Sequence, residues 1–185
     1  MSNPRNQPQY QIRFDWGVDG ANAIAPGTHI LVWVDALPDD LDGSGIDPTT
    51  LDYEGAILAG SVGARDAIAA WVLDRQVELG DRAVVAVVAA GGPDGRFAVE
   101  DLLAAGAVID ALADVGIDYI SPEAAAAVGA YTGLRNATGH VLSASVSGQE
   151  LIAAAGTRDV IGPHRERNES PEFAVLRPMG ELTRS

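Results

Sequence analysis

The chain has 185 residues, of which 47% are hydrophobic and 21% charged, and it carries a formal net charge of −14. The length suits one domain with a substantial core, and the negative charge argues against a nucleic-acid surface, which needs clustered basic side chains. No apolar run reaches the roughly 18 residues of a membrane span and the N-terminus lacks an apolar signal core, so we expect a cytoplasmic protein that binds no membrane.

Two residue types are missing from the chain. It contains no Cys, which excludes thiol nucleophiles, disulfides and thiolate metal sites. It also contains no Lys, since all 12 basic residues are Arg, and this excludes Schiff-base chemistry and the lysine of a P-loop. A phosphate group would therefore have to be bound by Arg, by backbone N–H groups or through a metal ion.

The first third of the chain predicts a polar arm followed by two strands. Residues 1–8 are polar and contain Pro, so we interpret them as a flexible arm that precedes a single domain over 9–185. Alternation over 9–14 predicts a strand, with a short helix after it. The apolar run 29–34 predicts a buried strand that ends at Asp35, followed by an acidic connection.

The middle of the chain alternates strands with helices. The runs 55–60 and 82–90 predict buried strands. A helical pattern opens at Ser61 and extends to about Glu78, and an apolar stripe predicts a long helix over 98–116.

The last third begins with a predicted short strand over 118–120. Ser121 and Pro122 then have the pattern of a helix N-cap with Pro at the first helical position. A short capped helix is predicted over 147–156 and a last strand over 172–178. Strands that alternate with helices indicate an α/β domain with a mainly parallel sheet.

Ligands of open parallel sheets bind beyond the carboxyl ends of the strands. Asp35 follows one predicted strand, and Glu100 and Asp101 open the long helix after another, so we expect them at the same edge. Carboxylates are the oxygen ligands that Mg²⁺ requires. The alternatives are a turn role for Asp35 and a favourable interaction of Glu100 and Asp101 with the helix dipole.

Two further segments offer groups for an anion. Gly60 and Ser61 lie at a strand-to-helix turn and could present N–H groups and a hydroxyl to a phosphate, although a helix-capping Ser explains the same pattern. Arg96 lies in a Gly- and Pro-containing loop that is equally explained as a turn. The three His residues share no spacing that would indicate a metal site or a Ser–His pair.

The acidic stretch 38–54, PDDLDGSGIDPTTLDYEG, resembles a calcium-binding loop at its start. A loop that begins at Asp40 would place Asp47 at an apolar position and Leu51 where a bidentate Glu is needed. An EF-hand is therefore excluded. The stretch is interpreted as a polar connection between strands, with a weak Ca²⁺ or Mg²⁺ contact as the alternative.

The segments FAVEDLLAAGAVIDAL, ISPEAAAAV and SASVSGQELI resemble the 2-phosphosulfolactate phosphatase (ComB-like) family. YQIRFDWGVDGANAI is similar to the opening of that family, and ILVWVDAL is similar to the strand that delivers its Asp. The resemblance spans most of residues 10–160. It implies a three-layer α/β/α fold and, on this basis alone, a homodimer.

The resemblance also implies a Mg²⁺-dependent phosphatase that acts on a small phosphorylated acid. Asp35 would be the catalytic residue and, with Glu100 and Asp101, a metal ligand. Gly60, Ser61 and Arg96 would face the phosphate.

The chain departs from the family pattern at several positions. The family's Arg-Asn pair inside the next helix aligns with Gly63 and Ala64, and the acidic stretch stands where the family has a longer segment. Two hypotheses follow: a phosphatase of this family, or a degenerate, non-catalytic homologue that binds a small anion or a protein partner.

Overall fold

The computed structural model describes residues 3–39 and 45–180, and its centre is a five-stranded sheet in the order β1-β4-β2-β3-β5. The first four strands are parallel to one another and β5 is antiparallel to β3. The strands are β1 (Ile12–Trp16), β2 (Ile30–Val34), β3 (Ala56–Gly60), β4 (Val85–Ala89) and β5 (Val175–Arg177). The predicted α/β class with a mainly parallel sheet is confirmed.

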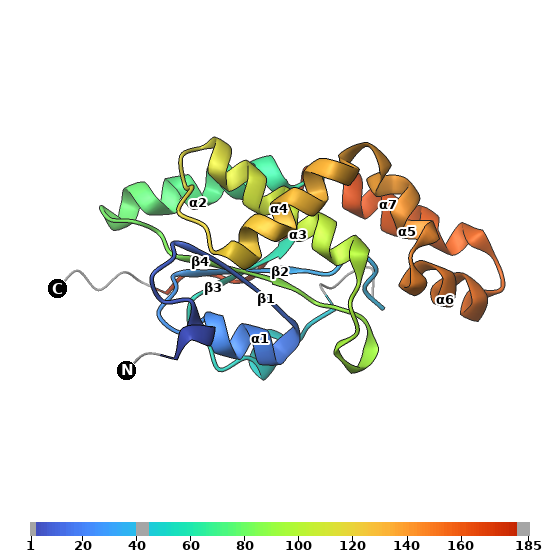
Figure 1. Ribbon diagram of the computed structural model, residues 1–185, viewed down its shortest axis with the longest axis horizontal. Helices are drawn as coiled ribbons and strands as arrows, with labels where there is room; N and C mark the ends of the chain where they lie inside the picture. The colour runs from blue at the N-terminus through green and yellow to red at the C-terminus, as the bar shows by residue number, and fades with distance from the viewer. Residues whose placement is uncertain (1–2, 40–44, 181–185) are drawn as a thin grey trace.

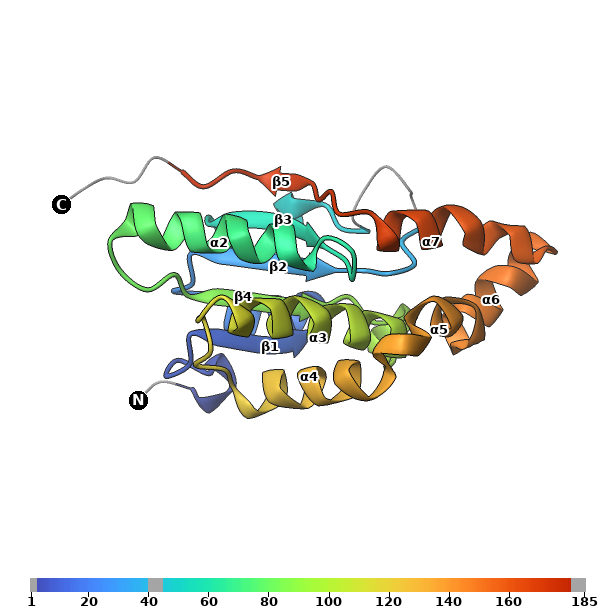
Figure 2. The ribbon, with the colours of Figure 1, turned by 90° about the horizontal axis from the view of Figure 1, so that it is seen from above.

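Helices cover both faces of the sheet, as Figure 1 shows. One face carries α1, the other carries α2, α3 and α4, and α5, α6 and α7 lie beyond the carboxyl ends of the parallel strands (Figure 2). The helices are α1 (Gly17–Ile24), α2 (Arg65–Leu79), α3 (Val99–Asp114), α4 (Pro122–Leu134), α5 (Thr138–Ala144), α6 (Val146–Ala155) and α7 (Ile161–Glu169). None of the helices in the described ranges is long and apolar enough to cross a membrane.

Strands β2, β3 and β4 form the centre of the core because every residue in them is buried. Alternate side chains of β2 enter opposite layers: Ile30 and Val32 pack under α2 and α3, whereas Leu31 and Trp33 pack against α1. Continuous apolar runs are what a parallel sheet covered on both faces requires. The same registers align Val34 with the last residues of β3 and β4, so these strands end at one edge.

Predicted elements in the last third of the chain differ from the structure, and the last strand, expected over 172–178, is shorter and spans Val175–Arg177. The expected strand over 118–120 is wrong, because only Ile120 makes an isolated bridge, to Ile12, while Asp118 and Tyr119 are exposed. The helix predicted over 147–156 starts at Val146 and is capped one step earlier than expected, by the hydroxyl of Ser145, which accepts from the N–H of Gly148 at 3.1 Å.

Ser121 caps α4 as predicted. Its hydroxyl accepts from the N–H of Ala124 at 3.1 Å, and Pro122 occupies the first turn. Near the N-terminus, the side chain of Gln7 is buried and binds both backbone groups of Phe14, with its amide donating to the carbonyl at 2.8 Å. These contacts fix the chain before β1.

Candidate functional site

Three predicted carboxylates line one cavity at the carboxyl ends of the strands. Asp35 directly follows β2, and Glu100 and Asp101 lie in the first turn of α3. All three line a cavity of about 980 Å³, here called the rim cavity, together with Gly91 from the loop after β4 and Leu151 of α6. The structure thus brings together side chains that are separated by 65 positions in the sequence.

Asp101 connects two of the loops that leave the sheet. Its Oδ1 accepts from the N–H of Ala36 at 2.8 Å and its Oδ2 accepts from the N–H of Gly91 at 2.9 Å. The side chain is only 2% exposed, and this burial, together with the charge of Asp35, raises the pKa of Asp101 well above its ordinary value. Asp101 therefore holds the loops after β2 and β4 in place.

Asp35 lies partly buried beside these loops. Its Oδ1 accepts from the N–H of Leu37 at 3.1 Å, and its backbone carbonyl accepts from the guanidinium of Arg167 at 2.9 Å. Burial, with a smaller contribution from the charges of Asp39 and Glu100, raises the pKa of Asp35 from 3.8 to about 6, against the lowering effects of the Leu37 N–H and of Arg167. A carboxyl group with such a pKa can carry or release a proton near neutral pH.

Glu100 is the least satisfied of the three carboxylates. It is 4% exposed, and its Oε2 is buried without a hydrogen-bond partner in the described part of the chain. A buried carboxylate oxygen without a partner is costly, and in native proteins such an atom marks a place for water, an ion or a ligand. This atom is the strongest structural indication that the rim binds something.

The donor set of the rim suits Mg²⁺ in its chemistry, because it contains oxygen ligands only. Across residues 3–39 and 45–180, no group of three or more His, Asp or Glu side chains is close enough to enclose a metal ion. Mg²⁺ is usually held by one or two carboxylates together with water and substrate oxygens, so a complete protein cage is not required. The unpartnered oxygen of Glu100 is consistent with this mode of binding.

The residues predicted to face a phosphate lie elsewhere. Gly60 ends β3, and a Cβ on it would lie 2.8 Å from the side chains of Val32 and Val34. Ser61 is buried, and its hydroxyl accepts from the N–H of Ala64 at 3.2 Å at the start of α2. Neither residue lines the rim cavity.

Arg96 is engaged with α6. Its guanidinium forms an ion pair with Glu150 at 2.8 Å, which links the loop after β4 to that helix. Glu150 lines the rim cavity, whereas Arg96 does not. A phosphate would have to compete with Glu150 for this cation.

The acidic stretch 38–54 is described only in part, because residues 40–44 lie outside the described ranges. Asp39 and Asp47 line the rim cavity. The Oδ1 of Asp47 accepts from the N–H of Thr49 at 2.9 Å and from its hydroxyl at 2.8 Å, which is a local turn interaction. The described part of the stretch therefore behaves as a polar connection that also contributes acids to the cavity.

Two residues that hold the backbone after β2 were missed by sequence reasoning, and both lie on α7. Besides the Arg167 contact, the amide of Asn168 donates to the carbonyl of Ala36 at 2.8 Å, so α7 fixes the backbone after β2 from the far end of the chain. The segment IGPHRERNE has no apolar stripe and contains Pro163, so no periodic signal marked it as a helix.

The end of α7 also occupies the space around Gly63. The N–H of Gly63 donates to the carbonyl of Asn168 at 2.7 Å, and a Cβ on Gly63 would collide with the backbone of Glu169. No side chain fits at this position without movement of α7. The packing of α7 against Gly63 thus explains why the chain lacks a side chain where the family has its Arg-Asn pair.

Comparison with known proteins gives a family match for this chain. The family model described as 2-phosphosulpholactate phosphatase matches residues 50–162, which is more than half of the chain. No curated protein sequence gives a match. The matched segment contains Ser61, Arg96, Glu100 and Asp101, whereas Asp35 precedes it. The chain therefore belongs to the 2-phosphosulpholactate phosphatase family.

Proposed function

We propose that the chain hydrolyses the phosphomonoester of a small phosphorylated acid in a Mg²⁺-dependent reaction, with 2-phosphosulfolactate as the substrate suggested by the family. The observation that carries the proposal is the unpartnered, buried oxygen of Glu100 beside Asp35 and Asp101 in the rim cavity. Family membership supplies the reaction class.

Charge explains why a cation is needed. Six acidic residues line the rim cavity, and no Arg or His lies among its described lining residues: the six are Asp35, Asp39, Asp47, Glu100, Asp101 and Glu150. A phosphate dianion would be repelled by such a surface. Mg²⁺, held by Asp35 and Glu100 together with water and substrate oxygens, would neutralise charge on the phosphate oxygens and polarise the phosphoryl group, while Asp101, whose two carboxylate oxygens accept from backbone N–H groups, would act from behind these ligands.

The protein's own groups have distinct tasks in this proposal. Asp101 fixes the loops after β2 and β4 through its two backbone hydrogen bonds, so the cavity is preorganised. Asp35, with a pKa of about 6, is largely ionised at neutral pH and is available either as a ligand or as the base that receives a proton from attacking water. Arg167 holds the backbone of Asp35 at the cavity edge.

A second candidate function is a non-catalytic homologue that binds a small anion or a protein partner. It is favoured by the position of the predicted phosphate-binding groups: Gly60 and Ser61 are directed into the fold, and Arg96 is paired with Glu150. Phosphoryl transfer depends on positioning and on charge neutralisation, so the loss of these groups would remove much of the catalytic power.

Phosphate release distinguishes the two candidates. The full chain would be assayed with 2-phosphosulfolactate and with a panel of other phosphomonoesters, with and without Mg²⁺, alongside Asp35→Asn and the exposed matched control Asp114→Asn. Turnover that requires Mg²⁺, is lost in Asp35→Asn and is retained in Asp114→Asn would support the phosphatase. Turnover of the folded wild-type protein that never exceeds that of Asp35→Asn would support the non-catalytic homologue.

A further inference from the structure

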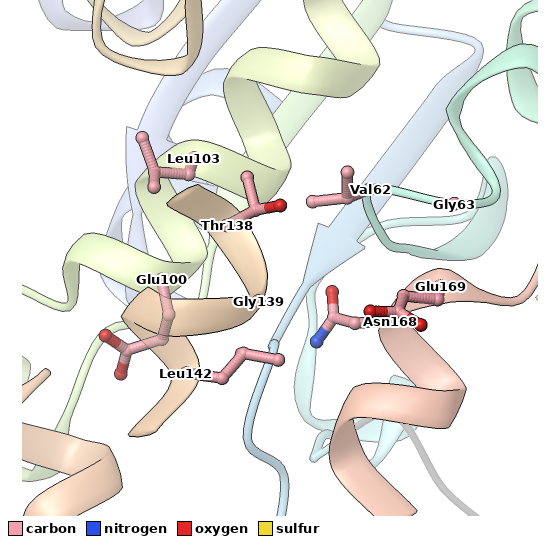
Figure 3. A pocket seen from close by; sticks show the side chains of 9 residues that line it. All are labelled: Val62, Gly63, Glu100, Leu103, Thr138, Gly139, Leu142, Asn168 and Glu169. Atoms are coloured by element: carbon pink, nitrogen blue, oxygen red, sulfur yellow. The ribbon is translucent and has the colours of Figure 1, made fainter. Parts of the chain in front are cut away.

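A second cavity lies between the loop after β3 and the helices α3, α5 and α7. Its volume is about 200 Å³, and we call it the inner pocket (Figure 3). Val62, Leu103 and Leu142 give it apolar walls. Glu169, which also lines it, is exposed and Gly139 is partly exposed, so the pocket opens to solvent between α5 and α7.

Asn168 presents an unused hydrogen-bond acceptor to this pocket. The side chain is 4% exposed, and its Nδ2 donates to the carbonyl of Ala36, whereas its Oδ1 has no partner among the described residues. Because that carbonyl accepts only from the nitrogen, the contact fixes which way the amide is turned. In Figure 3 the amide oxygen points toward the space between Val62 and Thr138. An unpaired buried amide oxygen costs free energy that a bound hydrogen-bond donor would recover.

The charges around the pocket disfavour an ionic ligand. Glu100 and Glu169 line it and no Arg or His lies among its described lining residues, so an anion would be repelled. In Figure 3 the carboxylate of Glu100 is directed away from Asn168. A cation at Asn168 would therefore exchange its hydration for one neutral acceptor, which does not compensate the lost solvation. The favoured donor is uncharged.

The size and the polar groups of the pocket define the rest of the ligand. An apolar cavity of roughly 150 Å³ admits benzene, so a space of about 200 Å³ accommodates a body of about four to six carbons. The apolar walls offer water few of the roughly two to four hydrogen-bond partners that it needs when buried. Besides Asn168, only Thr138 supplies a side-chain donor among the described lining residues, so a ligand with many acceptors would leave some of them unpaired.

We infer that the inner pocket binds a small neutral aliphatic alcohol. The hydroxyl group donates to Oδ1 of Asn168, and the alkyl body packs against Val62, Leu103 and Leu142. The inference goes beyond the proposed phosphatase activity and does not depend on it, because the cation proposed for the rim cavity is held by carboxylates and the alcohol uses none.

Four probes of similar size test the class of ligand. Butan-1-ol and its isomer diethyl ether test the hydrogen bond, because only the alcohol can donate, and butyrate and butylammonium test the charge. Each would be titrated into the isotope-labelled full chain at neutral pH without divalent cations, and the backbone amides and the side-chain amide of Asn168 would be followed by NMR. We expect butan-1-ol to bind in the millimolar range and to shift Gly139 and Leu142, which line only the inner pocket, more than Gly91 and Ser147, which line only the rim cavity.

The other probes should bind less well than the alcohol. Diethyl ether should bind about three- to ten-fold more weakly and should leave the side-chain amide resonances of Asn168 almost unchanged, because it cannot donate to Oδ1. Butylammonium should bind more weakly than butan-1-ol because its charge loses hydration, and butyrate should leave all these amides unchanged.

Variants test the assignment to this pocket. Val62→Phe should fill the space and abolish the butan-1-ol shifts. Val77→Phe makes the same change at a position on α2 that is 74% exposed, and this variant should bind like the wild type. Leu142→Phe, which narrows the pocket from α5, is a second filling variant. Circular dichroism and thermal unfolding would establish that each variant is folded.

Several results would overturn the inference. These are equal binding of diethyl ether and butan-1-ol, tighter binding of butylammonium or butyrate than of butan-1-ol, saturable shifts confined to the rim cavity, or undiminished binding in a folded filling variant. Absence of any shift at Gly139 and Leu142 up to the solubility limit of butan-1-ol would show that the pocket does not take this class of ligand.

Discussion

Burial keeps Asp35 protonated to a higher pH than an ordinary aspartate, because its charged form loses solvation and meets the charges of Asp39 and Glu100. The protonated form therefore stabilises the folded state. Its contribution is fully present below the ordinary pKa of 3.8 and is lost as the pH rises through about 6.

The pH dependence of stability should report this residue. Asp35→Asn removes the titrating group but keeps an oxygen that can accept from Leu37. Between about pH 4 and pH 7 the free energy of unfolding of the wild type should therefore fall by roughly 2–3 kcal/mol more than that of Asp35→Asn. Urea denaturation of both proteins across this range, without divalent cations, measures the difference. Parallel pH profiles would show that Asp35 titrates normally.

At the scale of elements, α7 holds the loop after β2 in place through two side-chain hydrogen bonds. Arg167 donates to the carbonyl of Asp35, and Asn168 donates to the carbonyl of Ala36. Both contacts join positions 132 residues apart in the chain. The geometry of the rim therefore depends on a helix that lies far from β2 in the sequence.

Truncation of Asn168 should weaken the contact between α7 and the loop after β2. Asn168→Ala removes the donor to Ala36 and leaves a buried carbonyl unpaired, so we expect a loss of about 1–3 kcal/mol in the free energy of unfolding. Asn136→Ala, on an exposed turn, is the matched control and should change stability by less than about 0.5 kcal/mol. Equal urea midpoints for the wild type and Asn168→Ala would show that the hydrogen bond from Asn168 to Ala36 does not stabilise the loop after β2.

The pair α3 and α4 depends on a close approach at Gly106. A Cβ on Gly106 would collide with the carbonyl of Ala127 and the side chain of Tyr131, so the two helices can pack only without a side chain there. Gly129 and Gly133 on α4 face open space instead.

Alanine should therefore have opposite effects at these glycines. Gly106→Ala should destabilise by about 1–3 kcal/mol, as overpacking does, in spite of the better helix propensity of Ala. Gly129→Ala should stabilise by up to about 1 kcal/mol, because only propensity changes. Thermal unfolding of the two variants and the wild type measures both effects. A Gly106→Ala variant more stable than the wild type would contradict the described packing of α3 on α4.

At the scale of the whole molecule, the sheet and the rim could be predicted because their signals are local. The apolar runs of β2, β3 and β4 indicated strands buried on both faces, and the parallel arrangement then placed Asp35, Glu100 and Asp101 at one edge. The expected strand over 118–120 failed because only Ile120 pairs, next to the start of β1.

Other parts of the site had no such signal. Helix α7 lacks an apolar stripe, and its role comes from hydrogen bonds to residues distant in the sequence. The pairing of Arg96 with Glu150 depends on how α5, α6 and α7 sit beyond the strands (Figure 2). The same packing leaves buried oxygens of Glu100 and Asn168 without a partner and forms the cavity of about 200 Å³ that both residues line. These arrangements are properties of packing and could not be predicted from residue patterns.

The net charge of −14 gives the whole molecule a general attraction for cations, so a specific site must be separated from this background. Titration calorimetry with Mg²⁺ at physiological salt, on the wild type, Asp35→Asn and the exposed control Asp114→Asn, makes that separation most directly. We predict saturable binding of one Mg²⁺ by the wild type and by Asp114→Asn, and its loss in Asp35→Asn. Saturable binding of equal strength in all three proteins, or none in the wild type, would contradict a cation site at the rim.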